Sequence, residues 1–347
     1  MQNLRHLSLA ELTTLLATFQ EKPYRAKQIY EWIWKHNVAS IEDMSNISKE
    51  LRDELSKNYF IKKVGIDEKQ VSEDGTIKNR FMLRDAYVVE GVLIPTDKRY
   101  TACVSSQVGC SLTCKFCATG KMNRERNLDY DEIYDQVAII NQQTQEHYGQ
   151  KLSNIVYMGM GEPLLNYKNV LKSIERITSH EGLGMANSRI TVSTAGIAKM
   201  IKQLGDDKVK FNLAVSLHAA NDAKRNEIMP INESNNLETL IEALNYYYAA
   251  TKNKVTFEYI LFSNFNDSIQ DAKELVKICR QVPSKVNLIE YNPVEGVAFI
   301  KPDEERTMAF MHFLEDHKIT ARLRRSRGKD IDAACGQLAN KAKNSVQ

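Results

Sequence analysis

The feature that most constrains the fold is an alternation of short apolar runs with amphipathic helical stretches, which begins after Thr101. Apolar runs of this length, separated by helices, are typical of βα units whose parallel strands are buried on both faces. Six such units in a row predict a partial or complete barrel. The six runs are TACVSS, NIVYMGMG, RITVSTAG, FNLAVSLH, VTFEYILF and VNLIEYNP. The helical stretches between them start near Asp129, Tyr167, Ile197, Asp222, Leu237, Ser268 and Glu304.

The chain before this region has a different pattern. Residues 1–60 predict three helices, the first of which begins with a capping box formed by Ser8 and Glu11. The next stretch has short β-rich runs with a turn at Asp85-Ala86. We therefore expect an N-terminal helical domain over 1–60, a β-rich connecting segment over 61–98, a barrel over 99–325 and a C-terminal segment over 326–347.

Composition excludes several classes of protein. Hydrophobic residues make up 43% and charged residues 26% of the 347 residues, so the chain is neither disordered nor fibrous. The formal net charge is +3, which neither requires nor excludes a nucleic-acid partner. No apolar run reaches the ~20 residues that span a bilayer, and we see no secretory signal pattern. We expect a cytoplasmic protein with no membrane contact, whose thiols stay reduced.

Four of the six cysteines lie close together. Cys110, Cys114 and Cys117 form a C-x3-C-x2-C motif in a loop after the first apolar run, and thiolates so spaced can bind one soft metal centre. A structural zinc site normally has four protein ligands, whereas this loop supplies three and no second CxxC or HxxxH follows. An iron–sulfur cube held by three cysteines keeps one iron open for a substrate. A zinc-stabilised binding module remains the alternative.

Polar residues follow the apolar runs where the strands of a barrel would end. They are Gly161-Glu162, Ser193-Thr194, Ser216-Leu217-His218 and Asn292. Because barrel chemistry gathers at the carboxyl ends of the strands, these residues predict one site. Taken alone, Cys103 would be a small buried hydrophobe and Glu90 a solvent-facing strand residue.

The cysteine motif, with Phe116 before its last cysteine, resembles the signature of the radical S-adenosylmethionine (SAM) enzymes. Longer blocks resemble one family of that superfamily, the RlmN family of dual-specificity RNA adenine methyltransferases. These blocks are ACVSSQVGCSLTCKFCATG, NIVYMGMGEPLLN, AVSLHA, NLIEYNP and RGKDIDAACGQL, and YRAKQIYEWIW is similar to the family's accessory domain. The resemblance implies a partial (β/α)6 TIM-like radical SAM barrel with a small N-terminal helical domain that binds RNA.

The resemblance also implies the cofactors and their residues. Cys110, Cys114 and Cys117 match the ligands of one [4Fe-4S] cluster. Two SAM molecules are used per turnover. The SAM pocket matches Gly161, Glu162, Ser193, Ser216, Leu217, His218 and Asn292.

The reaction implied by the resemblance adds a methyl group to C2 of adenosine 2503 in 23S ribosomal RNA, and to the adenine at position 37 of certain tRNAs. That carbon is electron-poor and cannot attack a methyl sulfonium, which is a chemical reason to use a radical. Cys335 matches the cysteine that a first SAM methylates and that then joins protein to RNA covalently. Cys103 matches the partner that releases the product through a transient disulfide with Cys335, and Glu90 matches the acceptor of the C2 proton.

The implied partners are 23S rRNA, tRNA and an electron donor of the ferredoxin or flavodoxin type, and we expect a monomer. Five cations among residues 322–329 form either a solvated face or an RNA contact. Three alternatives remain at this stage: C8 methylation of the same adenine as in the sister Cfr family, a radical SAM activating enzyme for a partner protein, and the zinc module. Pro163 and Ala219 favour the C2 type over the Cfr type.

Overall fold

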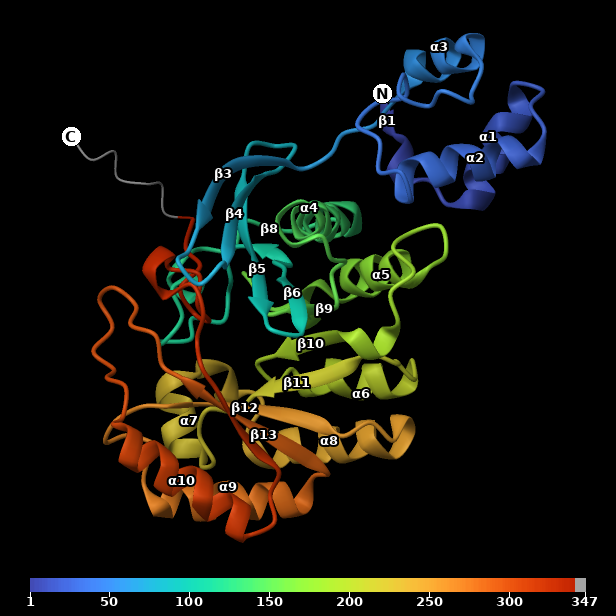
Figure 1. Ribbon diagram of the computed structural model, residues 1–347. Coiled ribbons are helices and arrows are strands. Elements are labelled where there is room, and N and C mark those ends of the chain that lie inside the picture. Colours follow the sequence, from blue (N-terminus) through green and yellow to red (C-terminus); the bar gives the residue numbers. More distant parts are fainter. Residues whose placement is uncertain (341–347) are drawn as a thin grey trace.

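The structure is a computed structural model that describes residues 1–340 (Figure 1). Its centre is a ten-stranded sheet in the order β14-β13-β12-β11-β10-β9-β6-β5-β4-β3. The six expected barrel strands are all present, and each pairs with its neighbour in parallel. They are β6 (Arg99–Cys103), β9 (Asn154–Tyr157), β10 (Ile190–Thr194), β11 (Asn212–Ser216), β12 (Val255–Leu261) and β13 (Ser284–Glu290). The predicted partial barrel is therefore confirmed.

A seventh parallel strand, β14 (Ala321–Arg324), pairs with β13 at the edge of the sheet. The sequence analysis placed this stretch at the end of the barrel region and counted Arg322 and Arg324 in a basic segment, without predicting a strand. Ala321 and Leu323 pack against the hydrophobic core, and alternate residues along the strand are arginines. The alternation of side chains along a strand thus lets one short stretch be both core and basic surface.

On the other side of β6 the sheet continues with antiparallel strands. These are β3 (Gly65–Val71), β4 (Ile77–Met82) and β5 (Val88–Thr96). The expected turn between β4 and β5 is present, with Ala86 at a φ of 66°. Two small strand pairs stand apart from this sheet: β1 (Gln2–Asn3) with β2 (Tyr59–Phe60), and β7 (Gln107–Val108) with β8 (Arg126–Asn127).

Helices connect the parallel strands and begin where the sequence predicts. They are α4 (Tyr130–Tyr148), α5 (Tyr167–Thr178), α6 (Ala198–Asp206), α7 (Asp222–Ile228), α8 (Leu237–Thr251), α9 (Ile269–Gln281) and α10 (Glu304–Asp316). In Figure 1, α4, α5, α6 and α8 lie along one side of the sheet. Within residues 1–340, no helix combines the length and the apolar character needed to cross a bilayer.

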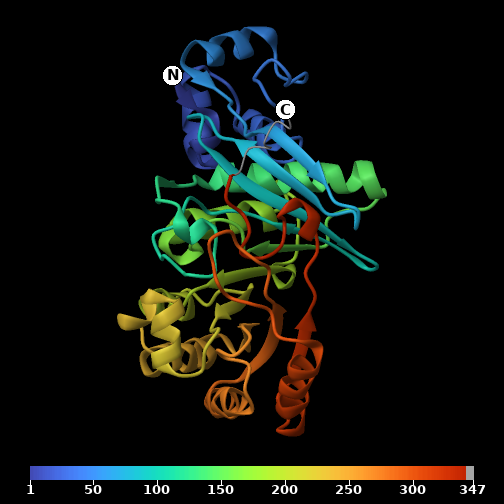
Figure 2. The same cartoon turned by 90° about the vertical axis from the view of Figure 1, so that its left-hand side faces the viewer.

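The N-terminal domain contains α1 (Leu9–Thr18), α2 (Pro23–Trp34) and α3 (Lys49–Asn58). The predicted capping box is present, since Ser8 and Glu11 bond each other's backbone N–H groups. Arg5 anchors this domain to α4, donating from Nη1 and Nη2 to Asp135 at 2.6 and 2.7 Å with both side chains buried. Figure 2 shows the domain packed at the end of the molecule that α4 borders.

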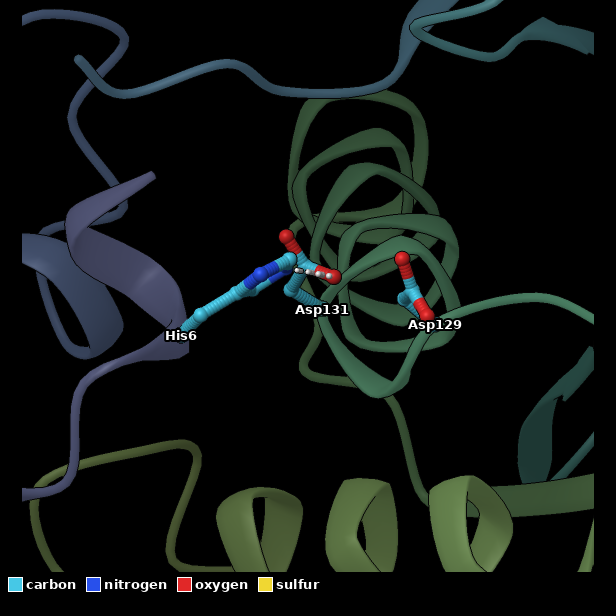
Figure 3. A group of neighbouring side chains, drawn as sticks. All are labelled: His6, Asp129 and Asp131. Carbon is cyan, nitrogen blue, oxygen red and sulfur yellow. Dashed lines mark ion pairs between the residues drawn. The ribbon is translucent and has the colours of Figure 1, made fainter. Parts of the chain in front are cut away.

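His6, Asp129 and Asp131 lie beside this anchor, and their ligand atoms lie within 4.8 Å of one another (Figure 3). Such a group could hold a metal ion, but Arg84 already contacts all three residues. Its Nη1 lies 3.3 Å from His6 Nε2 and 3.6 Å from Asp131 Oδ2, and its Nη2 bonds Asp129. We interpret the group as an ion-pair network that joins the N-terminal domain to the barrel.

Candidate functional site

A cavity of about 160 Å³ opens at the carboxyl ends of the parallel strands. Residues of β9 to β14 and of the cysteine loop line it. Of the sequence-predicted residues, it is lined by Cys110, Cys114, Cys117, Gly161, Glu162, Ser193, Ser216, His218 and Cys335. The fold therefore brings nine predicted residues from five separate segments of the chain to one cavity.

The loop with the three cysteines is held by backbone hydrogen bonds next to Cys114 and next to Cys117. Lys115 N donates to Ile228 O at 3.0 Å, and Ala118 N donates to Gly336 O at 2.8 Å. The three thiols are free. Burial raises the pKa of Cys110 to about 11 and also raises the pKa values of Cys114 and Cys117. Protons on such thiols are displaced when a soft metal centre binds, so this donor set fits an iron–sulfur cluster.

Gly161 and Glu162 form the turn after β9. Gly161 has a φ of 95°, and a Cβ there would lie 2.5 Å from Gln107 Cβ, so only glycine fits. The buried carboxylate of Glu162 accepts from Leu164 N at 2.9 Å and from Ala195 N at 2.8 Å. Burial raises the pKa of Glu162, and these two bonds oppose that rise. Glu162 thus links the ends of β9 and β10 and still lines the cavity.

His218 follows β11 and is buried, with its ring edge against Phe116. Its Nδ1 accepts a hydrogen bond from Ile260 N at 3.1 Å, which assigns the ring proton to Nε2. Burial lowers the pKa of His218 to about 3, so the ring is neutral at physiological pH. The side chain can therefore donate one hydrogen bond from Nε2.

Two of the residues expected in the SAM pocket do not line this cavity. Leu217 is 1% exposed and belongs to the core, and its backbone N–H bonds Glu258 O at 3.0 Å. Asn292 donates from Nδ2 to Ser326 Oγ at 2.8 Å and to the Cys335 carbonyl at 3.4 Å. Asn292 therefore contacts the C-terminal segment that carries Cys335.

A second cavity of about 100 Å³ is lined by Cys103, Cys117, Arg324 and Cys335. Cys103, at the end of β6, is buried, and this raises the pKa of its thiol to about 12 against the opposing charge of Arg324. The charge of Cys335 is the main cause of the raised pKa of Arg324. Both cysteines are free thiols in the structure, and the predicted disulfide stays a prediction.

Glu90 lies on β5 and is 2% exposed, so the solvent-facing interpretation of this strand position is wrong. Its Oε2 accepts from Ala339 N at 2.8 Å and Asn340 N at 3.1 Å, and its Oε1 lies 3.7 Å from Lys78 Nζ. The residues that follow Cys335 thus cover Glu90. It lines neither of the two cavities.

The sequence analysis missed Glu258 at the site and Arg225 beside the strand ends, and it counted Arg324 only in the basic segment. Glu258 lies on β12, and its Oε2 is buried without a hydrogen-bond partner at 4.0 Å from Arg324 Nη1. Both side chains line the larger cavity. A charged residue inside an otherwise apolar strand, such as Glu258 in VTFEYILF, is the signal that could have identified it.

Comparison with known proteins identifies the family. Residues 2–61 match the ribosomal RNA large subunit methyltransferase N-terminal domain, and residues 104–276 match the radical SAM superfamily. A dual-specificity RNA methyltransferase RlmN from Campylobacter hominis is 42% identical, with 98% of each chain covered. An RlmN relative from Cytophaga hutchinsonii is 58% identical over 97% of this chain and 93% of its own.

The chain belongs to the RlmN family. The crystal structure of a radical SAM methyltransferase from Sphaerobacter thermophilus is similar over 97% of this chain and 99% of its own, with 39% identity and a TM-score of 0.92. The chain is therefore a radical SAM methyltransferase that uses a [4Fe-4S] cluster and SAM. Because the chain belongs to the RlmN family, the two alternatives of a zinc-stabilised module and a radical SAM activating enzyme are rejected. The comparisons do not favour the third alternative, Cfr-type chemistry.

Proposed function

We propose that this enzyme methylates C2 of adenosine 2503 in 23S rRNA and of adenine 37 in certain tRNAs. One observation carries the proposal beyond family membership. Cys335, from the C-terminal segment, lines both the cavity at the cysteine loop and the smaller cavity that holds Cys103. This placement suits a cysteine that receives a methyl group on one side and delivers it on the other.

Cys110, Cys114 and Cys117 would hold the cluster, and the remaining cavity residues would hold SAM. When bound, these groups supply the methyl group and the one-electron chemistry that an unactivated carbon needs. Gly161 would let the backbone approach the ligand closely, and His218 would donate from Nε2. The hydroxyls of Ser193 and Ser216 would add polar contacts at the strand ends.

Cys335 Sγ would accept the methyl group. One hydrogen atom of that methyl group would pass to the radical that a second SAM supplies, and the carbon would then bond adenine C2. The C2 proton and one electron would leave, and the electron would return to the cluster. Release would follow when Cys103 Sγ bonds Cys335 Sγ as the bond between Cys335 Sγ and carbon breaks. The electron pair of that bond stays on the carbon, which takes up a proton and becomes the product methyl group. Glu90 would accept the C2 proton, provided that the Ala339 and Asn340 N–H groups leave its carboxylate.

The proposal includes the partners. The cations of the 322–329 segment precede Cys335 in the sequence. Arg325, one of them, is largely exposed and pairs with Glu304. Exposed arginines there would contact the RNA backbone, while the shape of an unpaired adenine would give specificity. We further propose a ferredoxin- or flavodoxin-type electron donor, a monomeric enzyme and a cytoplasmic location, where both RNA substrates are made.

The test is methylation in a defined reaction. The cluster is first reconstituted in the absence of oxygen. SAM, a reductant and an unmodified rRNA fragment are then added. After the reaction, the RNA is digested to nucleosides for mass spectrometry. We expect a peak that matches authentic 2-methyladenosine. A peak of 8-methyladenosine, or SAM cleavage without any methylated base, would contradict the proposal. A tRNA transcript tested in parallel decides the second substrate.

A further inference from the structure

Arg225 is a buried cation whose hydrogen bonds all go to uncharged oxygens within residues 1–340. It lies on α7 and is 0% exposed. Nη2 donates to the carbonyls of Ala195 at 2.7 Å and Ser216 at 3.2 Å, Nε donates to the Leu217 carbonyl at 3.2 Å, and Nη1 donates to Asn232 Oδ1 at 2.6 Å. The guanidinium thus links the ends of β10 and β11.

A buried charge is costly unless an opposite charge compensates it. The Arg225 guanidinium is linked to the carboxylate of Asp222 only through the side chain of Asn232, whose Nδ2 donates to Asp222 Oδ1 at 2.8 Å. Burial lowers the pKa of Arg225 to about 10, which still leaves it charged at neutral pH. Within residues 1–340, no carboxylate therefore contacts the Arg225 cation directly.

The cysteine loop contacts the end of the helix that carries this cation. Lys115 N, next to Cys114, bonds the carbonyl of Ile228 at the end of α7. A thiolate at Cys114, as in a bound cluster, raises the pKa of Arg225 and opposes the effect of burial. A cluster bound by three thiolates is negative, and reduction adds one more negative charge.

We propose that Arg225 is the positive counter-charge of the iron–sulfur cluster and raises its reduction potential. The inference rests on the proposed ligands Cys110, Cys114 and Cys117. A fixed cation in a low-dielectric interior favours the more negative, reduced cluster. Arg225 is a positioning residue in addition, because its bonds hold the strand ends that line the cavity.

The counter-charge role and the positioning role can be separated by a redox titration of the reconstituted full chain. Electron paramagnetic resonance monitors the titration. Arg225→Gln removes the charge, whereas Arg225→Lys keeps the charge and loses most of the hydrogen bonds. At a fixed applied potential, we expect the ratio of reduced to oxidised cluster to fall about tenfold in Arg225→Gln, which is ~59 mV for a one-electron couple. Arg225→Lys should stay near wild type.

Lys224→Gln is the matched control, since Lys224 lies on the same helix and pairs with Asp271. It should leave the potential unchanged. If Arg225→Gln does not fold, Asn232→Asp places a carboxylate at Nη1 and should lower the potential in the same direction. Equal potentials in wild type and in whichever charge-changing variant folds would overturn the inference.

Thermal unfolding gives a second readout. Arg225→Gln should gain less stability than wild type on cluster loading, because the counter-charge is gone. An equal gain would overturn the inference. If the wild-type protein takes up no iron or sulfide, the proposed cluster ligands are refuted instead. Failure of the counter-charge inference can therefore be distinguished from failure of the proposed ligands.

Discussion

Cys103 and Cys335 line one cavity, although one ends the first barrel strand and the other lies in the C-terminal segment. Arg324 lines the same cavity, and its charge interacts with both thiols. This charge opposes the rise that burial causes in the pKa of Cys103. This arrangement suits a pair of cysteines that act in sequence.

Cys335→Ala should abolish RNA methylation and leave SAM cleavage to deoxyadenosine near the wild-type rate, because the variant loses the methyl acceptor and keeps the cysteine loop. Nucleoside mass spectrometry measures RNA methylation, and a chromatographic assay of deoxyadenosine measures SAM cleavage. Cys279→Ala is the control, since Cys279 packs on α9 away from both cavities, and it should stay active. Methylation by Cys335→Ala would contradict the assigned role.

Cys103→Ala should trap a covalent complex of protein and RNA, because the thiol that would release the product is missing. The complex should appear on a denaturing gel as a band that ribonuclease shifts, and turnover should fall by at least about 100-fold. In Cys103→Ala combined with Cys335→Ala the band should be absent. Normal turnover of the single variant without any adduct is the result that would refute the release step.

His218 should make the free energy of unfolding depend on pH. Its pKa is lowered from 6.5 in the unfolded chain to about 3 in the folded protein, so only the unfolded chain takes up this proton between those values. Stability contributed by neutral His218 is full above pH 6.5 and falls as the pH drops toward 3, by up to ~1.4 kcal/mol per pH unit.

His218→Asn tests this dependence, because asparagine tolerates the positive φ of 54° and does not titrate. Urea unfolding of the protein without its cluster, at several pH values from 5 to 7, should show a shallower dependence on pH below 6.5 in the variant. Identical slopes in the two proteins would show that folding does not lower the pKa of His218.

Arg5→Met should weaken docking of the N-terminal domain on α4. It leaves the buried Asp135 carboxylate without its cation, which typically costs ~3–5 kcal/mol of unfolding free energy. Hydrogen exchange should rise in α1 and α2 before it rises in the barrel. Lys57→Met removes an exposed ion pair with Glu54 and should change little. Unchanged protection of α2 in Arg5→Met would show that packing of Trp34 alone holds the domain.

The sequence by itself determined what local chemistry controls. Ser8 and Ser268 accept hydrogen bonds from the first turns of their helices, so helix starts are predictable from a few adjacent residues. The spacing of Cys110, Cys114 and Cys117 likewise indicates a metal loop without any knowledge of the fold. The six apolar runs predicted six parallel strands, because burial on both faces leaves a continuous apolar pattern.

Only the tertiary structure decided what depends on contacts between distant segments. Glu90 is buried because residues 339 and 340 fold over it, and no pattern in its own strand indicates this. Arg225 lies on the short helix α7, and its guanidinium bonds the carbonyls at the ends of two strands. Such positions depend on which segments the sheet brings together, and that is set by long-range packing rather than by neighbours in sequence.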